Sequence, residues 1–390
     1  MGRTAIFIIF ISVGTLLWGS IHYYVGARLF RPWRASDKTK RIAKVAFWFG
    51  FALTPLTLFG SRLFRGGAPE VLVWPGLVHM GFFFLLFCFT VFRDVGLLGV
   101  RGIARLGKKP VSEDRRAFLT RSTNAGVLGL TSAVGGLGVY EALSDPELVE
   151  VDVPISGLPT ALDGYRIAQI SDVHVGPTIK RGFVEHLVSR INALDVDMVA
   201  VTGDLVDGQV DVLRPHTSAF SEMRGKDGVY FCTGNHEYYS GALEWIEEVR
   251  RYGWIPLVNE HRLVERDGFR LLIAGCTDHT AERMIPEHKT DPVGSKAGAP
   301  AHDASVLLAH QPRSIHAAAE AGFDLQLSGH THGGQFFPVT LFVDLAHPFG
   351  IGLNQEDQTW IYVNRGTGYW GPPIRAGVPS EITLLRLVRA

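Results

Sequence analysis

Hydrophobic and polar positions divide the chain into two parts. Before residue 145, apolar residues form long uncharged runs at residues 5–27, 45–60, 71–92 and 122–140. After residue 150, the apolar runs are short and alternate with stretches of helical spacing. A helix needs about 20 apolar residues to cross a bilayer, whereas short apolar runs between helices are typical of buried strands. The pattern therefore predicts a helical membrane region followed by an α/β domain.

The first part, residues 1–145, is predicted to contain three to four membrane spans, at about residues 5–27, 45–62, 71–92 and 123–140. Basic residues gather between the first and second runs and between the third and fourth, while the intervening loop has only Arg62, Arg65 and Glu70 as charged residues. Cytoplasmic loops have an excess of Lys and Arg. We therefore expect a multi-pass protein of the cell membrane, with the α/β domain, residues 146–390, on the periplasmic or extracellular side.

A short motif before the fourth run permits two interpretations. Residues 114–119, Asp-Arg-Arg-Ala-Phe-Leu, are similar to the twin-arginine export motif, and a Gly-rich apolar run follows them. The first interpretation predicts the twin-arginine export machinery as a partner. In the second, Arg115 and Arg116 only add positive charge to a cytoplasmic loop. Both give the same topology.

Composition and charge narrow the classes of function. The chain of 390 residues is 46% hydrophobic and 19% charged, with a mean hydropathy of +0.14, which is more apolar than an ordinary soluble protein. Residues 1–122 have 18 Lys and Arg against 5 Asp and Glu, whereas residues 123–390 have 20 against 33. The half that resembles a folded domain is therefore the acidic one. Nucleic acid is therefore not an expected partner. Three cysteines without a Cys-x-x-Cys motif exclude a disulfide framework and a thiolate zinc site.

The second part is predicted to alternate strands with helices. Helices are expected over residues 178–194 and 241–252, whereas residues 277–304 and 333–354 lack a regular pattern and read as long functional or mobile loops. Aromatic and aliphatic residues in the second loop could enter a membrane interface or could simply pack, and composition leaves both open. The expected strands are residues 165–170, 198–202, 229–233, 271–274, 305–309, 325–328, 360–363 and 382–388.

Polar residues of one chemical kind follow these strands. Ligands of open α/β sheets bind outside the carboxyl ends of the strands. Carboxylates, a carboxamide and imidazoles that converge there predict a metal site with nitrogen and oxygen ligands, and their number favours two ions. The alternative is that they pair with one another or with the backbone. In order, they are Asp172, His174, Asp204, Asp207, Asn235, His236, His310, His330 and His332.

This ordered set resembles the motifs of the calcineurin-like metallophosphoesterase family. The resemblance implies a four-layer αββα sandwich of two mixed sheets, and a hydroxide activated between two divalent ions (Mn, Fe, Zn or Ni). It also implies that His236 faces the phosphate and that Asp207 orients His236. It assigns Asp172, His174, Asp204 and His332 to the first metal, and Asp204, Asn235, His310 and His330 to the second, with Asp204 bridging.

A finer resemblance concerns residues 329–335, Gly-His-Thr-His-Gly-Gly-Gln, and residues 368–375, which end in Pro-Ile-Arg. Both are similar to a membrane-anchored bacterial phosphodiesterase branch, some of whose members hydrolyse the pyrophosphate of UDP-2,3-diacylglucosamine. We therefore expect a metal-dependent hydrolase of phosphate esters that acts on a phosphorylated lipid or lipid-linked substrate, such as a UDP-diacylglucosamine-type molecule. Arg313, Arg365 and Arg375 are candidates for holding a second phosphate. The alternatives are a tethered phosphodiesterase or nucleotidase for soluble substrates, and a metal-binding sensor module without catalysis.

Overall fold

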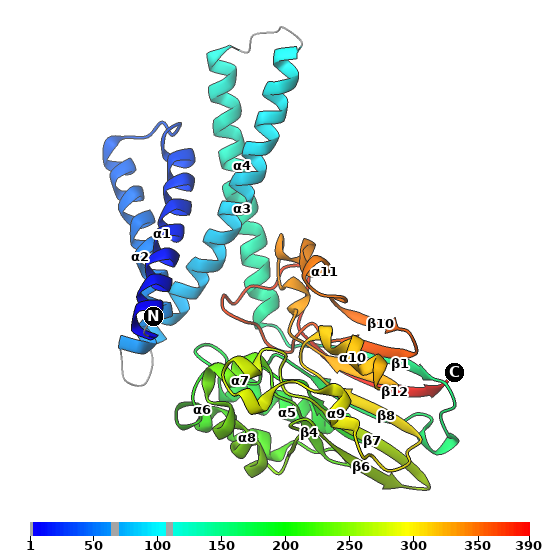
Figure 1. Ribbon diagram of the computed structural model, residues 1–390. Coiled ribbons are helices and arrows are strands. Elements are labelled where there is room, and N and C mark those ends of the chain that lie inside the picture. Colours follow the sequence, from blue (N-terminus) through cyan, green and yellow to red (C-terminus); the bar gives the residue numbers. More distant parts are fainter. Residues whose placement is uncertain (1–2, 64–69, 107–111) are drawn as a thin grey trace. The chain divides into compact units, whose positions relative to one another are not determined.

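The computed structural model describes residues 3–63, 70–106 and 112–390, which form two units (Figure 1). The helical unit comprises residues 1–139 and the short segment 371–374. The catalytic unit comprises residues 140–370 and 375–390.

The helical unit contains four helices: α1 (Arg3–Phe30), α2 (Asp37–Leu63), α3 (Glu70–Leu106) and α4 (Glu113–Leu143). Among the described residues, two stretches are long and apolar enough to cross a bilayer, Val71–Ile103 of α3 and Glu113–Leu143 of α4. The expected number of three to four spans is therefore wrong for this part of the chain. The physical reason in α2 is that its first two turns are charged and leave an apolar stretch that is shorter than a bilayer core.

Aromatic contacts join the first three helices. His22 of α1 is fully buried and stacks on Phe83 of α3, with ring centroids 3.5 Å apart. Thr54 of α2 hydrogen-bonds His79 of α3, at 3.0 Å between Oγ1 and Nδ1. Stacked rings and a paired polar side chain fix helix positions where lipid supplies no hydrophobic driving force.

The catalytic unit is built from two mixed sheets of six strands each. The first has the order β1-β12-β2-β3-β4-β5 and the second the order β10-β11-β9-β8-β7-β6. In the first sheet β2, β3, β4 and β5 run parallel, and in the second β11, β9, β8 and β7 run parallel. The strands are β1 (Glu147–Ile155), β2 (Arg166–Ile170), β3 (Met198–Val201), β4 (Val229–Phe231), β5 (Ile255–Pro256), β6 (Glu260–Arg266), β7 (Phe269–Gly275), β8 (Ala304–Leu308), β9 (Leu325–Ser328), β10 (Gly352–Glu356), β11 (Thr359–Val363) and β12 (Glu381–Arg389).

Three buried clusters of side chains define four layers. Between the sheets, Ile167 and Met198 of the first sheet share a core with Leu271 and Val306 of the second. On the outer face of the first sheet, helices pack against the strands through a core that includes Trp245. On the outer face of the second sheet, α10 packs against the strands. The expectation of two mixed sheets with flanking helices is thus confirmed. The helices are α5 (Arg181–Ala193), α6 (Val210–Thr217), α7 (Asn235–Ser240), α8 (Ala242–Arg251), α9 (Pro292–Lys296), α10 (Ile315–Glu320) and α11 (Val343–Ala346).

The elements that sequence patterns missed lie mostly at sheet edges. All eight expected strands are present, whereas β1, β5, β6 and β10 were not predicted. Each of the four is at an edge of its sheet: β1 alternates charged and apolar residues, β5 has only two residues, β6 is mostly charged, and β10 is mostly half-buried. Edge strands lack the continuous apolar run that marks a buried parallel strand.

We expect Trp245→Ala to destabilise the catalytic unit strongly. Trp245 is fully buried in the core against the first sheet, and its Nε1 donates to Gly208 O at 2.9 Å. Removal of the indole side chain lowers the free energy of unfolding by about 3–5 kcal/mol and the unfolding temperature by roughly 10 °C. Thermal unfolding of the full chain in detergent measures the effect, with Leu243→Ala on the exposed side of the same helix as the control. An unchanged unfolding temperature for Trp245→Ala would contradict this packing.

Candidate metal centre

Polar side chains from both sheets meet at the carboxyl ends of the parallel strands. The loops after β2 and β3 carry Asp172 and His174, and Asp204 and Asp207, while Asn235 and His236 begin helix α7 after β4. The loops after β8 and β9 of the second sheet carry His310, His330 and His332. Gln169 of β2 links the two edges, because its Nε2 donates to Ser328 O of β9 at 2.9 Å.

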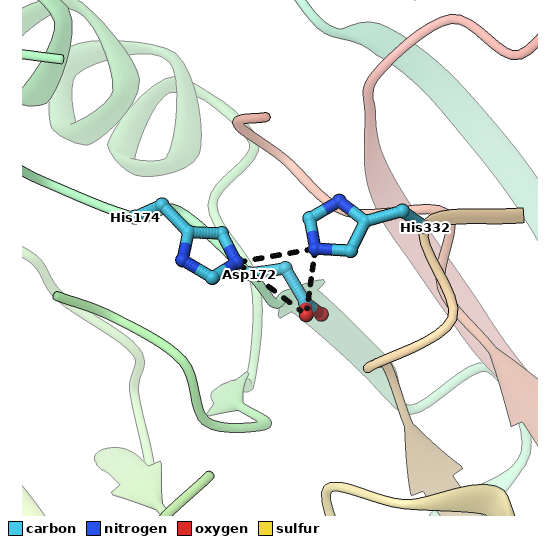
Figure 2. A group of neighbouring side chains, drawn as sticks. All are labelled: Asp172, His174 and His332. Carbon is cyan, nitrogen blue, oxygen red and sulfur yellow. Dashed lines mark hydrogen bonds and ion pairs between the residues drawn. The ribbon is translucent and has the colours of Figure 1, made fainter. Parts of the chain in front are cut away.

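The first group of potential ligands comprises Asp172, His174 and His332 (Figure 2). Asp172 Oδ1 lies 3.2 Å from His332 Nε2, and the Nε2 atoms of His174 and His332 lie 3.1 Å apart. His174 Nδ1 donates to Asp207 Oδ1 at 3.0 Å, which leaves Nε2 with the lone pair. An anionic oxygen and a lone-pair nitrogen therefore point to one place, which suits a cation.

The second group comprises Asp204, His310 and His330. Asp204 Oδ2 lies 3.1 Å from His310 Nε2, which in turn lies 3.2 Å from His330 Nδ1. His310 Nδ1 donates to Thr202 O at 2.7 Å, so its Nε2 is again the free nitrogen. An outer hydrogen bond that fixes the tautomer and the ring orientation is characteristic of metal-binding histidines.

Asn235 supplies an independent test of the fit to a metal. Its Oδ1 is buried and has no hydrogen-bond partner in the described part of the chain. A buried amide oxygen without a partner costs about 1–3 kcal/mol. Coordination of a cation would satisfy this oxygen, and carboxamide, carboxylate and imidazole groups together suit Mn, Fe, Zn or Ni. The residues present therefore fit the divalent ions expected from the sequence.

The backbone of the site is held in an unfavourable conformation. Asp172, His174, Asp204, His330 and His332 all have positive φ, between 50° and 72°. A left-handed conformation at a residue other than glycine costs of order 1–3 kcal/mol and persists where the surroundings enforce it. Five left-handed residues in three separate loops therefore indicate that the surrounding structure enforces the positions of these side chains.

Two glycines allow the loops to approach each other. A Cβ on Gly234 would lie 2.1 Å from Asp204 Oδ1, and a Cβ on Gly329 would lie 2.2 Å from Asp172 Oδ2. A side chain at either glycine position would therefore clash with one of these two carboxylates. The amides beside these glycines are also donors, because His330 N donates to Asp172 Oδ2 at 2.9 Å and His236 N donates to Asp204 Oδ1 at 2.8 Å.

Glu237 anchors the loops, a role that the sequence did not reveal. It is buried, and it accepts hydrogen bonds from the backbone amides of Asp204 (3.0 Å), Leu205 (2.8 Å) and Gly234 (2.7 Å). Burial and the nearby Asp204 carboxylate raise the pKa of Glu237 to about 7. The position of Glu237 directly after Asn235 and His236 was the available signal, but only coordinates identify which amides it binds.

Asp172, His330 and His332 have protonation states that suit metal binding, whereas His310 does not. Burial would lower the pKa of His310, but the Asp204 carboxylate outweighs burial and raises that pKa well above the ordinary value, so His310 must release a proton when metal binds. Burial alone would raise the pKa of Asp172, but its hydrogen bond with His332 and the nearby histidines hold that pKa well below the ordinary value. Burial lowers the pKa of His330 to about 3 and that of His332 to about 4. A charged carboxylate and neutral imidazoles are the forms in which these side chains bind metals.

Asp207 and His236 lie beside the first group. Asp207 Oδ1 accepts from His236 Nδ1 at 2.5 Å as well as from His174. Burial would lower the pKa of His236, but the bond to Asp207 and the Asp204 charge outweigh burial and raise the pKa to about 9. Tyr239 and Trp370 pack against His236, with ring centroids at 5.2 and 5.8 Å, although both are more than half exposed. Neither aromatic residue was predicted from the sequence to belong to the site.

The three arginines suggested for substrate binding occupy different environments. Arg375 is fully buried and donates to the backbone carbonyls of residues 365, 368 and 378. We expected Arg375 to contact the substrate, but a fully buried side chain does not reach a substrate in solution. Arg365 is paired with Glu381 at 2.5 Å and with Glu147 at 3.3 Å. Arg313 is exposed and donates to Ala346 O at 3.4 Å.

We expect Glu237→Gln to loosen the centre. An uncharged amide offers one acceptor oxygen, so at least one of the three backbone donors loses its partner at a cost of about 1–3 kcal/mol. The variant should unfold at a lower temperature and bind less metal, as measured by differential scanning calorimetry and by elemental analysis of the purified chain. Glu244→Gln, at an exposed position nearby, is the control. Equal metal content in both variants would contradict the anchoring role.

Comparisons with known proteins agree with this geometry. The family model described as "Calcineurin-like phosphoesterase" matches residues 165–334. A "Transmembrane protein with metallophosphoesterase domain" of Danio rerio is 36% identical over 321 residues, which cover 80% of this chain and 72% of the relative. The protein of the same name from Bos taurus is 34% identical and covers 73% of this chain and 67% of the relative.

Bacterial relatives are also similar. An uncharacterized metallophosphoesterase of Campylobacter jejuni is 35% identical over 252 residues, which cover 64% of this chain and 65% of the relative. Because the relatives include vertebrate proteins, the narrower expectation of a bacterial membrane-anchored branch is not confirmed. The chain belongs to the calcineurin-like metallophosphoesterase family, and its metallophosphoesterase domain hydrolyses phosphate esters with divalent metal ions.

Proposed function

We propose that the catalytic unit holds two divalent ions and hydrolyses the phosphate ester of a membrane lipid or of a lipid-linked molecule. In this proposal Asp172, His174 and His332 bind the first ion. Asn235, His310 and His330 bind the second, and Asp204 bridges the two. The two groups of side chains described above support the division, and the unpartnered Asn235 Oδ1 supports the second ion.

The reaction in this proposal combines the metals with a proton donor. When bound, two divalent ions polarise the phosphoryl group and lower the pKa of water. His236 keeps its proton at neutral pH because Asp207 accepts a hydrogen bond from its Nδ1. Its Nε2 lies 3.9 Å from Asp204 Oδ2 and is thus directed to the ligands. From there it would donate the proton to the leaving oxygen.

Asp207 contributes by holding two imidazoles at once. The same Oδ1 accepts from His174 and from His236, so a single carboxylate fixes the orientation of one proposed ligand and one proposed acid. Loss of Asp207 would therefore affect metal binding and proton donation together. This double contact supports an orienting role in place of direct metal coordination.

We expect His236→Ala to lower kcat about 10²–10⁴-fold, the usual contribution of general acid catalysis, while the metal content stays unchanged. The loss should be smaller for a p-nitrophenyl ester, whose leaving group needs no proton, than for an alkyl ester. Steady-state kinetics on both esters and elemental analysis measure these effects, with the half-buried His302→Ala, outside both groups of potential ligands, as the control. Asn235→Ala and chelation should instead remove activity together with metal. A kcat within twofold of the unchanged chain on the alkyl ester would contradict the proposed role of His236.

An exposed apolar surface beside the metal groups supports a lipid substrate, and it is the observation that carries this part of the proposal. The segment of residues 339–351, here called the apolar segment, follows the histidines directly in the sequence. Thr331 Oγ1 donates to Gly350 O at 2.6 Å, and the rings of His330 and His347 lie 5.3 Å apart. The exposed side chains of the segment are Val339, Leu341, Phe342, Leu345 (82% exposed) and Ile351.

Only part of the suggested interface contributes to this surface. Phe336 is buried, and Phe349 packs against the core of the second sheet, whereas Leu341 and Phe342 are more than half exposed. Clustered exposed aliphatic and aromatic side chains are unfavourable in water and enter a membrane interface readily. Arg313, at the base of the segment, could hold an anionic headgroup.

Membrane attachment supports the same substrate class. Helices α3 and α4 each contain a stretch long enough to cross a bilayer, and the vertebrate relatives are named as transmembrane proteins. A tethered enzyme meets lipid headgroups at a high effective concentration. In this proposal the basic stretches that flank the apolar runs are cytoplasmic, and the catalytic unit faces the opposite side of a multi-pass protein. Twin-arginine export stays a prediction.

Exposed aromatic residues favour a nucleotide-linked lipid within this class. Tyr239 and Trp370 are more than half exposed beside His236, and exposed aromatic rings can stack on nucleobases. A UDP-diacylglucosamine-type molecule would place its base on these rings and its acyl chains on the apolar segment. A tethered nucleotidase for soluble substrates would use the rings alone.

We expect the triple variant Leu341→Ser, Phe342→Ser and Leu345→Ser to lose about tenfold in kcat/KM on a phospholipid in vesicles, because partial burial of three apolar side chains contributes a few kcal/mol at most. Activity on the soluble diester bis(p-nitrophenyl) phosphate should stay within twofold. The matched control is Val212→Ser, Leu243→Ser and Val293→Ser, which removes three exposed apolar side chains elsewhere in the same unit. Hydrolysis of soluble nucleotides without hydrolysis of any lipid would favour the nucleotidase, and biological activity without hydrolysis would favour a sensor.

A further inference from the structure

The helical unit contains a pocket lined with arginines. The pocket has a volume of about 380 Å³ and lies between the end of α1, the second half of α3 and the beginning of α4. Its charged residues are Arg28, Arg31, Arg93, Arg101 and Asp94, so positive charge exceeds negative charge by three. We call it the basic pocket.

The basic pocket lies where two apolar helical stretches end together. The uncharged run of α1 ends at Arg28, and that of α3 ends at Arg93. Arg28 Nε lies 2.7 Å from Asp94 Oδ2, and Asn124 Nδ2 of α4 donates to Arg28 O at 3.0 Å. These contacts fix the ends of both runs at one level. Because the apolar stretch of α3 is long enough to cross a bilayer, the level of Arg93 corresponds to the interface of that bilayer with water.

The single carboxylate of the pocket is already occupied. Asp94 accepts from Tyr24 at 2.7 Å and is paired with both Arg28 and Arg93. Arg31 and Arg101 have no acidic partner within the described residues. Arginines held together without enough counter-charge repel one another, so an anion placed among them is stabilised.

A second pocket adjoins the first and has a different character. It has a volume of about 300 Å³ and shares Ala27 and Arg31 with the basic pocket. Tyr23, Phe30 and Trp48 line it together with Lys44. Tyrosine and tryptophan gather at the headgroup level of membranes because their rings are amphipathic. Charge and apolar surface side by side match a molecule with a charged head and an apolar body.

We propose that the basic pocket binds the phosphate-bearing headgroup of an anionic phospholipid. Arg31 lines both pockets and would contact the phosphate together with Arg101 of α3, which also lines the basic pocket. Guanidinium groups bind phosphate oxygens in pairs of parallel hydrogen bonds. The adjoining aromatic pocket would hold the glycerol and the first part of an acyl chain. This site is distinct from the metal centre and does not depend on the proposed substrate.

The test uses the full chain in nanodiscs. Each basic residue near a membrane surface contributes about 1 kcal/mol to binding of an anionic lipid, which is roughly fivefold in affinity. The double variant Arg31→Gln and Arg101→Gln should therefore bind phosphatidylglycerol roughly 25-fold more weakly, measured by native mass spectrometry and by the shift in unfolding temperature between phosphatidylcholine discs and discs with added phosphatidylglycerol. Both residues are exposed, so the fold should tolerate the change.

The control separates a pocket from general attraction between charges. Arg34→Gln with Lys38→Gln removes the same charge from exposed positions near the end of α1 that line neither pocket. Retained lipid binding in this control, together with loss in the pocket variant, supports the proposal. Equal losses in both variants would overturn it, as would equal retention. Inorganic phosphate in phosphatidylcholine discs is the third arm. Stabilisation by phosphate as large as that by phosphatidylglycerol would overturn the lipid assignment.

Discussion

Burial of two aspartates at the carboxyl ends of the strands is the constraint on which the catalytic unit depends. Asp172 and Asp204 are almost completely removed from solvent, and an isolated carboxylate in such surroundings is very unfavourable. The protein compensates with imidazoles, backbone amides and, in the metal-bound enzyme, divalent cations. Left-handed backbone at five proposed ligands and close glycine contacts are the structural cost of bringing these partners near enough.

The sequence predicted those parts of the fold in which a run of apolar residues can be explained in only one way, as a buried strand. A run such as residues 198–201 has no polar side chain, so it must be a strand buried on both faces. Aspartates and histidines that follow such runs must lie at the strand ends. The set of candidate ligands could therefore be named from the sequence, and the structure brings Asp172 near His332 across 160 positions.

Other features depend on partners that no pattern reveals. Arg375 reads as an exposed cation in the sequence, yet it lies inside the unit among backbone carbonyls. Glu237 reads as part of a short helix, yet it holds amides from two separate loops. The number of spans was wrong for a different reason, which the sequence does show. Charges at the start of α2 shorten its apolar stretch below the bilayer thickness.

The place of β12 in the first sheet has a consequence for biosynthesis. β12 (Glu381–Arg389) lies between β1 and β2, although it follows every other strand in the sequence. A growing polypeptide on the ribosome therefore leaves β1 without its neighbour until residues 381–389 have been translated. Strands that are far apart in the sequence pair slowly, and unpaired, aggregation-prone strand edges stay exposed until they do. Chaperones are expected to guard the nascent domain during this interval, and a premature stop codon shortly before residue 381 should yield aggregates in place of a weakened enzyme.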